Sequence, residues 1–176
     1  MKRTLGQLAL LAAAIIVPSL AGAQHAYVGT KGCKMCHQSE KQGQQFSIWE
    51  KSKHAGAYTT LTTARANEVA KAKGLAKPAA ESPECLVCHT IKGGPDAADI
   101  TQGVQCESCH GPGADYKAMA VMKVRDSAVK GGLQVFADKA AIEAMCKTCH
   151  NDKSPTAKSF NFDERWAAIA HKKPAA

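Results

Sequence analysis

Every cysteine in this chain belongs to one of four copies of the pattern Cys-x-x-Cys-His. The cysteine pairs are Cys33/Cys36, Cys85/Cys88, Cys106/Cys109 and Cys146/Cys149, and the histidines that follow them are His37, His89, His110 and His150. Two thiols at this spacing can bond to the two vinyl groups of one porphyrin, and the next imidazole can bind its iron. A lone Cys-x-x-Cys pair also suits a disulfide or half of a zinc site. The same histidine offset at all four pairs favours four covalently bound haem c groups.

Three further histidines, His25, His54 and His171, are candidates for second axial ligands. His54 and His171 each follow a tryptophan by five residues, after Trp49 and Trp166. On a continuous helix this interval places the two side chains about 140° apart, and a helix end offers free carbonyls that can accept the Nδ1 proton. We therefore expect His54 and His171 to be distal iron ligands. His25 is either a third such ligand or an ordinary solvated histidine.

The count of histidines limits the ligation. Four irons offer eight axial positions and the chain has 7 histidines, so at least one iron lacks a second histidine from the same subunit. Met119 and Met122 are the methionines after residue 23 that are neither inside nor adjacent to a haem motif. Each is either a thioether ligand, which would raise the potential of its haem, or a side chain that fills a gap in the core.

Short helices joined by loops must position these residues, because no stretch shows the sustained alternation of a β-sheet. The patterns predict helices over Ser39–His54, from Thr62 or Thr63 to Lys73, over Asp138–Cys149, and from a cap at Asn161 towards His171. A short helix is expected within 115–123 and a loop over 90–103. The predicted fold is mostly α with extensive loops, organised around four stacked haems.

The first 23 residues have the layout of a secretory signal peptide: a positively charged start, an uncharged stretch and small residues up to Ala23. We expect cleavage there, one tetrahaem domain over residues 24–176, a periplasmic location and no membrane-spanning segment after cleavage. The net charge of +8 falls to +6 without Lys2 and Arg3, and eight haem propionates would bring it to about −2. With only 5% aromatic residues, nucleic-acid binding is not expected.

Several segments resemble the tetrahaem cytochrome c-554 family. The similarity lies in Tyr27–Gly29, in Trp49–Ala55, in the block from Gly103 to Gly113 and in Phe162–Glu164. The resemblance implies stacked haem pairs, an electron-carrier role, and one five-coordinate iron at the second motif, with His54 and His171 in distal positions. The family also has a distal histidine shortly after the Gly-Pro-Gly turn, where this chain has Met119 and Met122 instead.

The leading interpretation is an electron carrier between redox partner proteins rather than an enzyme. One alternative is a haem enzyme that binds or reduces a small nitrogen species such as nitric oxide at an open iron. Another is self-association into a conductive filament, in which a histidine near the N-terminus reaches a neighbouring subunit.

Overall fold

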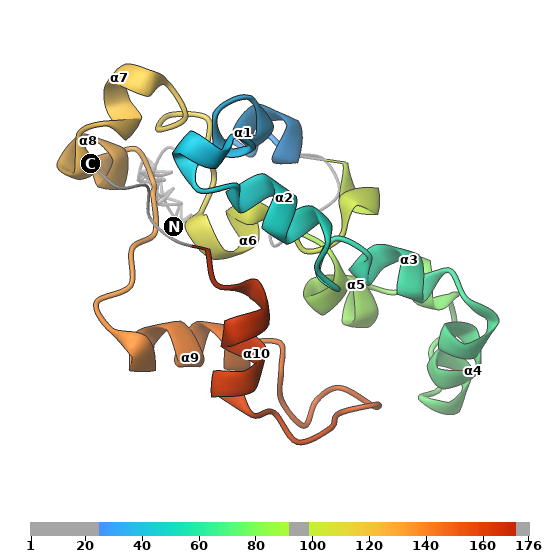
Figure 1. The fold of residues 1–176 in the computed structure, drawn as a ribbon. Coiled ribbons are helices and arrows are strands. Elements are labelled where there is room, and N and C mark those ends of the chain that lie inside the picture. Colours follow the sequence, from blue (N-terminus) through green and yellow to red (C-terminus); the bar gives the residue numbers. More distant parts are fainter. Residues whose placement is uncertain (1–24, 92–98, 172–176) are drawn as a thin grey trace, which may run out of the picture.

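The computed structural model describes residues 25–91 and 99–171, and this part of the chain is built from short helices. None of the helices is longer than nine residues, and the described residues contain no β-strand (Figure 1). The α-helices are α1 (Thr30–His37), α2 (Gln45–Glu50), α3 (Ala57–Leu61), α4 (Ala64–Ala72), α5 (Pro83–His89), α6 (Cys106–His110), α7 (Met119–Met122), α8 (Arg125–Lys130), α9 (Lys139–Lys147) and α10 (Phe162–Ile169). Three single turns of 3₁₀-helix complete them: η1 (Glu40–Gln42), η2 (Ala79–Glu81) and η3 (Ile100–Gln102). The all-α fold class predicted from the sequence is confirmed.

Side-chain caps set the starts of three helices, and the sequence predicted the cap at Asn161. Thr63 accepts a hydrogen bond from the Ala66 amide at the start of α4, and Asp138 accepts one from Ala141 at the start of α9. Asn161 likewise accepts from the Glu164 amide at the start of α10. Each cap satisfies one of the amides that has no partner within its helix.

The single helix predicted over Ser39–His54 is wrong. The chain forms η1, then reaches the left-handed region at Gln44, with a φ of 54°, and α2 runs only from Gln45 to Glu50. Ser52 then donates both its amide and its hydroxyl to the Trp49 carbonyl, at 2.8 and 2.6 Å. This turn satisfies the carbonyl locally, so the helix ends four residues before His54.

Within the described residues, few large nonpolar side chains are buried. They are Phe46, Leu61, Ile91, Tyr116 and Phe162. A small cluster of Leu61, Ala70 and Ala79 joins α3, α4 and η2. Because polypeptide packing supplies so little core in the described residues, the apolar faces of the helices need another apolar partner, which the predicted porphyrin rings would provide.

The arrangement of the helices leaves α9 and α10 side by side, apart from the pair α7 and α8 and from the group α3, α4 and α5 (Figure 1). Lys139 at the start of α9 forms an ion pair with Asp163 and lies over the Phe162 ring of α10. In residues 25–91 and 99–171, no helix has the length and apolar character needed to cross a membrane. The predicted signal peptide and residues 92–98, half of the predicted loop over 90–103, lie outside the described residues.

Candidate functional site

Each Cys-x-x-Cys-His motif lies on or at the end of a helix. The motifs at Cys33, Cys85 and Cys106 lie within α1, α5 and α6. The fourth begins in α9, and the His150 amide continues the helical pattern by donating to the Cys146 carbonyl at 3.0 Å. In a helix, residues at i, i+3 and i+4 share one face. Both thiols and the imidazole of each motif therefore lie on one side of its helix, as attachment to a single porphyrin requires.

Two of the motif histidines are paired with histidines from outside the motifs. The ring centres of His54 and His150 lie 6.0 Å apart, and those of His110 and His171 lie 5.9 Å apart. Metal–imidazole bonds are about 2.0 Å long, so two imidazoles on opposite sides of one iron have ring centres about 6 Å apart. The spacing of both pairs fits a bis-histidine iron.

Burial favours the neutral form of His54, His110 and His150. It lowers the pKa of His110 to about 4, with smaller contributions from the nearby rings of His171 and His37. Burial also lowers the pKa of His54, and His150 adds to this effect. The pKa of His150 is lowered by burial and then by the charge of Arg165. An imidazole must be unprotonated at the ligating nitrogen to bind a metal, so this environment suits iron ligation.

Hydrogen bonds to Nδ1 orient three of the histidines. His89 Nδ1 lies 2.8 Å from the Ala57 carbonyl, and His171 Nδ1 lies 3.2 Å from the Ile169 carbonyl. His37 Nδ1 lies 3.3 Å from Gln45 Oε1. An acceptor at Nδ1 fixes the proton there and leaves Nε2 for the iron. No local sequence pattern predicted that Ala57 or Gln45 would accept a hydrogen bond from a haem-ligand histidine.

The chain is similar to known multihaem cytochromes. The family model described as "Cytochrome c554 and c-prime" matches residues 32–111. Cytochrome c-554 of Nitrosomonas europaea is 31% identical over 152 residues, which cover 81% of this chain and 56% of that protein. The structure of reduced cytochrome c554 from Nitrosomonas europaea superposes with a TM-score of 0.53 at 26% identity, covering 81% of this chain and 82% of that one.

The chain is homologous to cytochrome c-554, and residues 32–111 match the cytochrome c554 family model. It spans just over half the length of the curated relative, so the activity and partners of that whole protein are not transferred to it here. This similarity indicates a multihaem c-type cytochrome, and the eight cysteines of the four motifs are consistent with four haem c sites.

The first and third motifs of this cytochrome lie next to each other. The Cys33 thiol is hydrogen-bonded to Cys106, which raises the pKa of Cys33 and lowers that of Cys106. His37 also contributes to the lowered pKa of His110. The side chains of the two motifs are therefore close enough to interact directly.

A cavity of about 710 Å³ joins the second and fourth motifs, with the third at its edge. Its lining includes His89 of α5, Cys109 of α6, His150, and His54 from the turn after α2. Phe160 stacks on the His150 ring, with centres 4.6 Å apart and planes tilted by 15°. The volume is within the range of cofactor and ligand pockets, so the residues present fit haem.

The helix geometry from which His54 and His171 were predicted as iron ligands is not present in the structure. α2 ends at Glu50 and α10 at Ile169, so neither tryptophan is joined to its histidine by continuous helix. The indole of Trp49 instead donates to the Val104 carbonyl at 2.7 Å and ties α2 to the segment before the third motif. The expectation of a helix-end carbonyl partner holds for His171, through Ile169.

The other two groups of candidates lie elsewhere. His25 lies beside the turn that follows α6, with Nδ1 2.5 Å from Asp115 Oδ2. Met119 and Met122 form the ends of the four-residue helix α7, and neither is buried. Met119 is 62% exposed, so the interpretation that it fills a core gap is wrong.

Proposed function

We propose that this chain is an exported tetrahaem cytochrome that carries electrons between redox partner proteins. The observation that supports this most directly is the pair of histidine contacts, His54 with His150 and His110 with His171. Imidazoles on both sides of an iron leave no position for a substrate, and this favours electron transfer over chemistry at the metal.

The residues that would hold the haems follow from the motifs. Thioether bonds would form at Cys33, Cys36, Cys85, Cys88, Cys106, Cys109, Cys146 and Cys149, and the proximal ligands would be His37, His89, His110 and His150. Haem c, when bound, supplies a one-electron iron couple. Burial lowers the pKa of His54, His110 and His150, and hydrogen bonds at Nδ1 orient His37, His89 and His171.

The contacts between motifs support a continuous path for electrons. The first motif contacts the third through Cys33 and Cys106, and the third shares the cavity with the second and fourth through Cys109. Each motif thus either contacts another motif directly or faces one across the cavity. The export part of the proposal is supported by the signal-peptide layout of residues 1–23.

The experiment that tests the proposal combines an intact mass with a reductive titration. We expect the purified protein to carry four haems, to begin at Gln24, and to take up four electrons per chain. Its oxidised electron paramagnetic resonance (EPR) spectrum should be dominated by low-spin iron. A mass that corresponds to three or fewer haems, or a spectrum dominated by high-spin iron, would contradict the proposal.

A second candidate function is supported by the surroundings of His89. His89 lines the cavity of about 710 Å³, yet the two close histidine pairs of the described residues include neither His89 nor His37. An open position on the second haem would admit a small ligand such as nitric oxide. If the chain is only a carrier, the reduced protein binds nitric oxide without turnover; sustained consumption of nitric oxide would instead establish the enzyme.

A further inference from the structure

A buried carboxylate ties the start of the described chain to the turn after the third motif. Glu107 is 2% exposed and accepts hydrogen bonds from three backbone amides: Val28 at 3.0 and 3.2 Å, Gly29 at 2.8 Å and Gly113 at 2.6 Å. A buried carboxylate with this many amide donors is well satisfied, and breaking the contact would strand its charge. The chain just before α1 is therefore fixed against the turn after α6.

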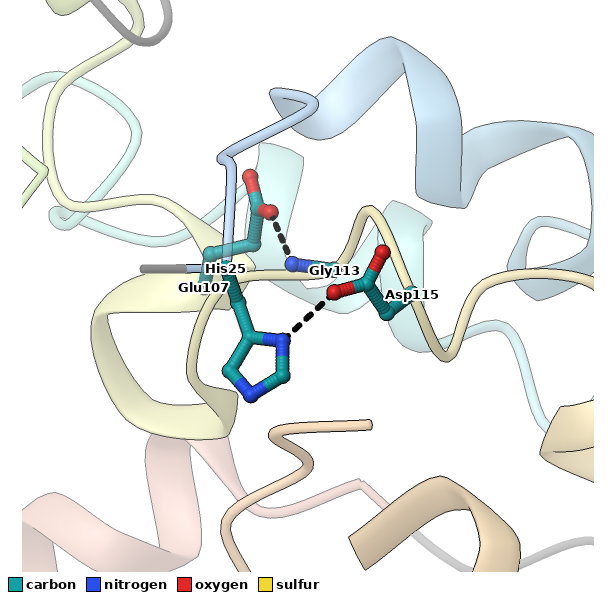
Figure 2. Close-up of polar contacts among 4 residues, drawn as sticks. All are labelled: His25, Glu107, Gly113 and Asp115. Atoms are coloured by element: carbon teal, nitrogen blue, oxygen red, sulfur yellow. Dashed lines mark hydrogen bonds and ion pairs between the residues drawn. The ribbon is translucent and has the colours of Figure 1, made fainter. Parts of the chain in front are cut away.

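This attachment brings His25 to Asp115. The Ala114 amide donates to the Ala26 carbonyl at 3.0 Å, which places His25 beside the turn. Figure 2 shows the imidazole directed at the carboxylate of Asp115, with Nδ1 2.5 Å from Oδ2 and the other ring nitrogen pointing away. Gly132 packs against the opposite side, since a Cβ there would lie 3.0 Å from His25 Cδ2. The ring is thus oriented by a carboxylate and by close packing.

An oriented imidazole of this kind is typical of a metal ligand. A carboxylate at Nδ1 holds the proton on that nitrogen, leaves Nε2 as the donor atom and makes it more basic. A solvated surface histidine would need neither the carboxylate nor the close packing against Gly132. The environment of His25 therefore favours the ligand interpretation over the solvated one.

The remaining histidines indicate which iron His25 serves. With His54 paired to His150 and His171 to His110, the irons of His37 and His89 have no partner among those pairs. The cavity that contains His89 is lined by no residue from 25–29 or 111–115. His25 instead belongs to the segment that leads directly into α1, the helix that carries His37, and it lies next to α6, which packs against α1.

We propose that His25 is the sixth ligand of the iron held by His37, and that Asp115 is a positioning residue for it. This inference rests on the proposed tetrahaem function. In the family that this chain resembles, a histidine after the Gly-Pro-Gly turn is a distal ligand. We assign that distal ligand role to His25, which precedes the first motif. The second iron, at His89, is then the one left without a second histidine.

The ligand assignment is tested by counting high-spin irons in the oxidised holoprotein. We expect one high-spin haem in the wild type and two in H25A. H171A, measured in parallel, should also show two. If H171A gains a high-spin haem and H25A does not, this inference is wrong and the proposed function stands. If neither variant changes, the wider ligand scheme fails.

A second variant covers the case in which H25A assembles fewer than four haems by mass. H25M keeps a ligand at the same position, and a thioether on iron raises the potential of that haem. A single haem with a raised potential in H25M supports the proposal. Four potentials equal to those of the wild type overturn it.

The role of Asp115 is tested through the reduction potential. D115N keeps an acceptor for Nδ1 but removes the negative charge, so the imidazole becomes a weaker donor and the reduced iron is favoured. We expect one haem to favour reduction about tenfold more, which is about 59 mV for a one-electron couple, while all spin states stay as in the wild type. D126N is the control for loss of one negative charge, because Asp126 is exposed in the first turn of α8. A shift no larger in D115N than in D126N overturns the positioning role.

Discussion

Replacing Gly103 by alanine should disturb the second and fourth haem sites together. Gly103 has φ 71° and ψ −143°, and a Cβ at this position would lie 2.4 Å from the His54 carbonyl oxygen and 2.9 Å from that of Ala55. The His54 oxygen accepts hydrogen bonds from Val104 at 2.9 Å and Ala57 at 3.2 Å. To reach an ordinary contact, the segment must move by at least about half an ångström.

The expected cost of G103A has two parts. A side chain at this positive φ costs about 1–2 kcal/mol, and weakening two hydrogen bonds to His54 costs about 1–3 kcal/mol more. G74A is the matched control, because Gly74 has a φ of 73° and nothing lies within 4 Å of the added Cβ. We therefore expect a loss of about 2–5 kcal/mol for G103A and about 1 kcal/mol for G74A.

The two variants should also differ in their spectra. His54 carries the ring that faces His150, and the Ala57 carbonyl orients His89. Unfolding by denaturant gives the free-energy change, and EPR of the oxidised protein reports whether the iron of His150 becomes high-spin in G103A alone. Equal stability and equal spectra for G103A and G74A would refute the claim that Gly103 is required by close approach to His54.

Three further predictions concern the histidine pairs, the buried Glu107 and the pKa of His110. H54A and H171A should each convert one low-spin iron to high spin, seen by EPR, and the double variant should convert two; a double variant with the wild-type spectrum would show that neither is a ligand. E107Q should lower the free energy of unfolding by about 2–4 kcal/mol in denaturant titrations. The reason is that the new side-chain amide directs N–H donors at backbone amides that donate to the carboxylate. A loss below about 0.5 kcal/mol would contradict the claim that Glu107 holds the two segments together. Because the pKa of His110 is lowered to about 4 from 6.5, the unfolded chain takes up a proton there that the folded chain resists. In the chain without haem, the contribution of His110 to the free energy of unfolding should therefore be lost as the pH drops from 6.5 towards about 4, and a rise in this contribution over the acid range, measured by denaturant against a His110 variant, would contradict it.

The sequence alone determined the chemistry of attachment and the local structure. The four Cys-x-x-Cys-His motifs act within one helical turn, so residue spacing is enough to predict them. The caps at Thr63, Asp138 and Asn161 are also local, because each side chain bonds an amide three residues later. Local interactions of this kind do not depend on how distant segments pack.

The prediction over Ser39–His54 was wrong because helical periodicity does not register a competing turn. The left-handed Gln44 and the hydrogen bonds from Ser52 to Trp49 interrupt the pattern at both ends of α2. The tryptophan-to-histidine spacing still pointed to His54 and His171, but for a reason that the structure does not support. Each histidine lies after the end of its helix. The direction of the backbone there, rather than the angle around the helix axis, sets the orientation of its ring.

Only the tertiary structure decided which histidines meet. His54 and His150 are 96 positions apart in the chain, and His110 and His171 are 61 apart, so their pairing depends on how the helices pack. The contact between His25 and Asp115 likewise exists because Glu107 holds two distant backbone segments together. Pairings across such separations have no local sequence pattern, because the free energy that fixes them comes from burial and hydrogen bonds formed only after the chain has folded.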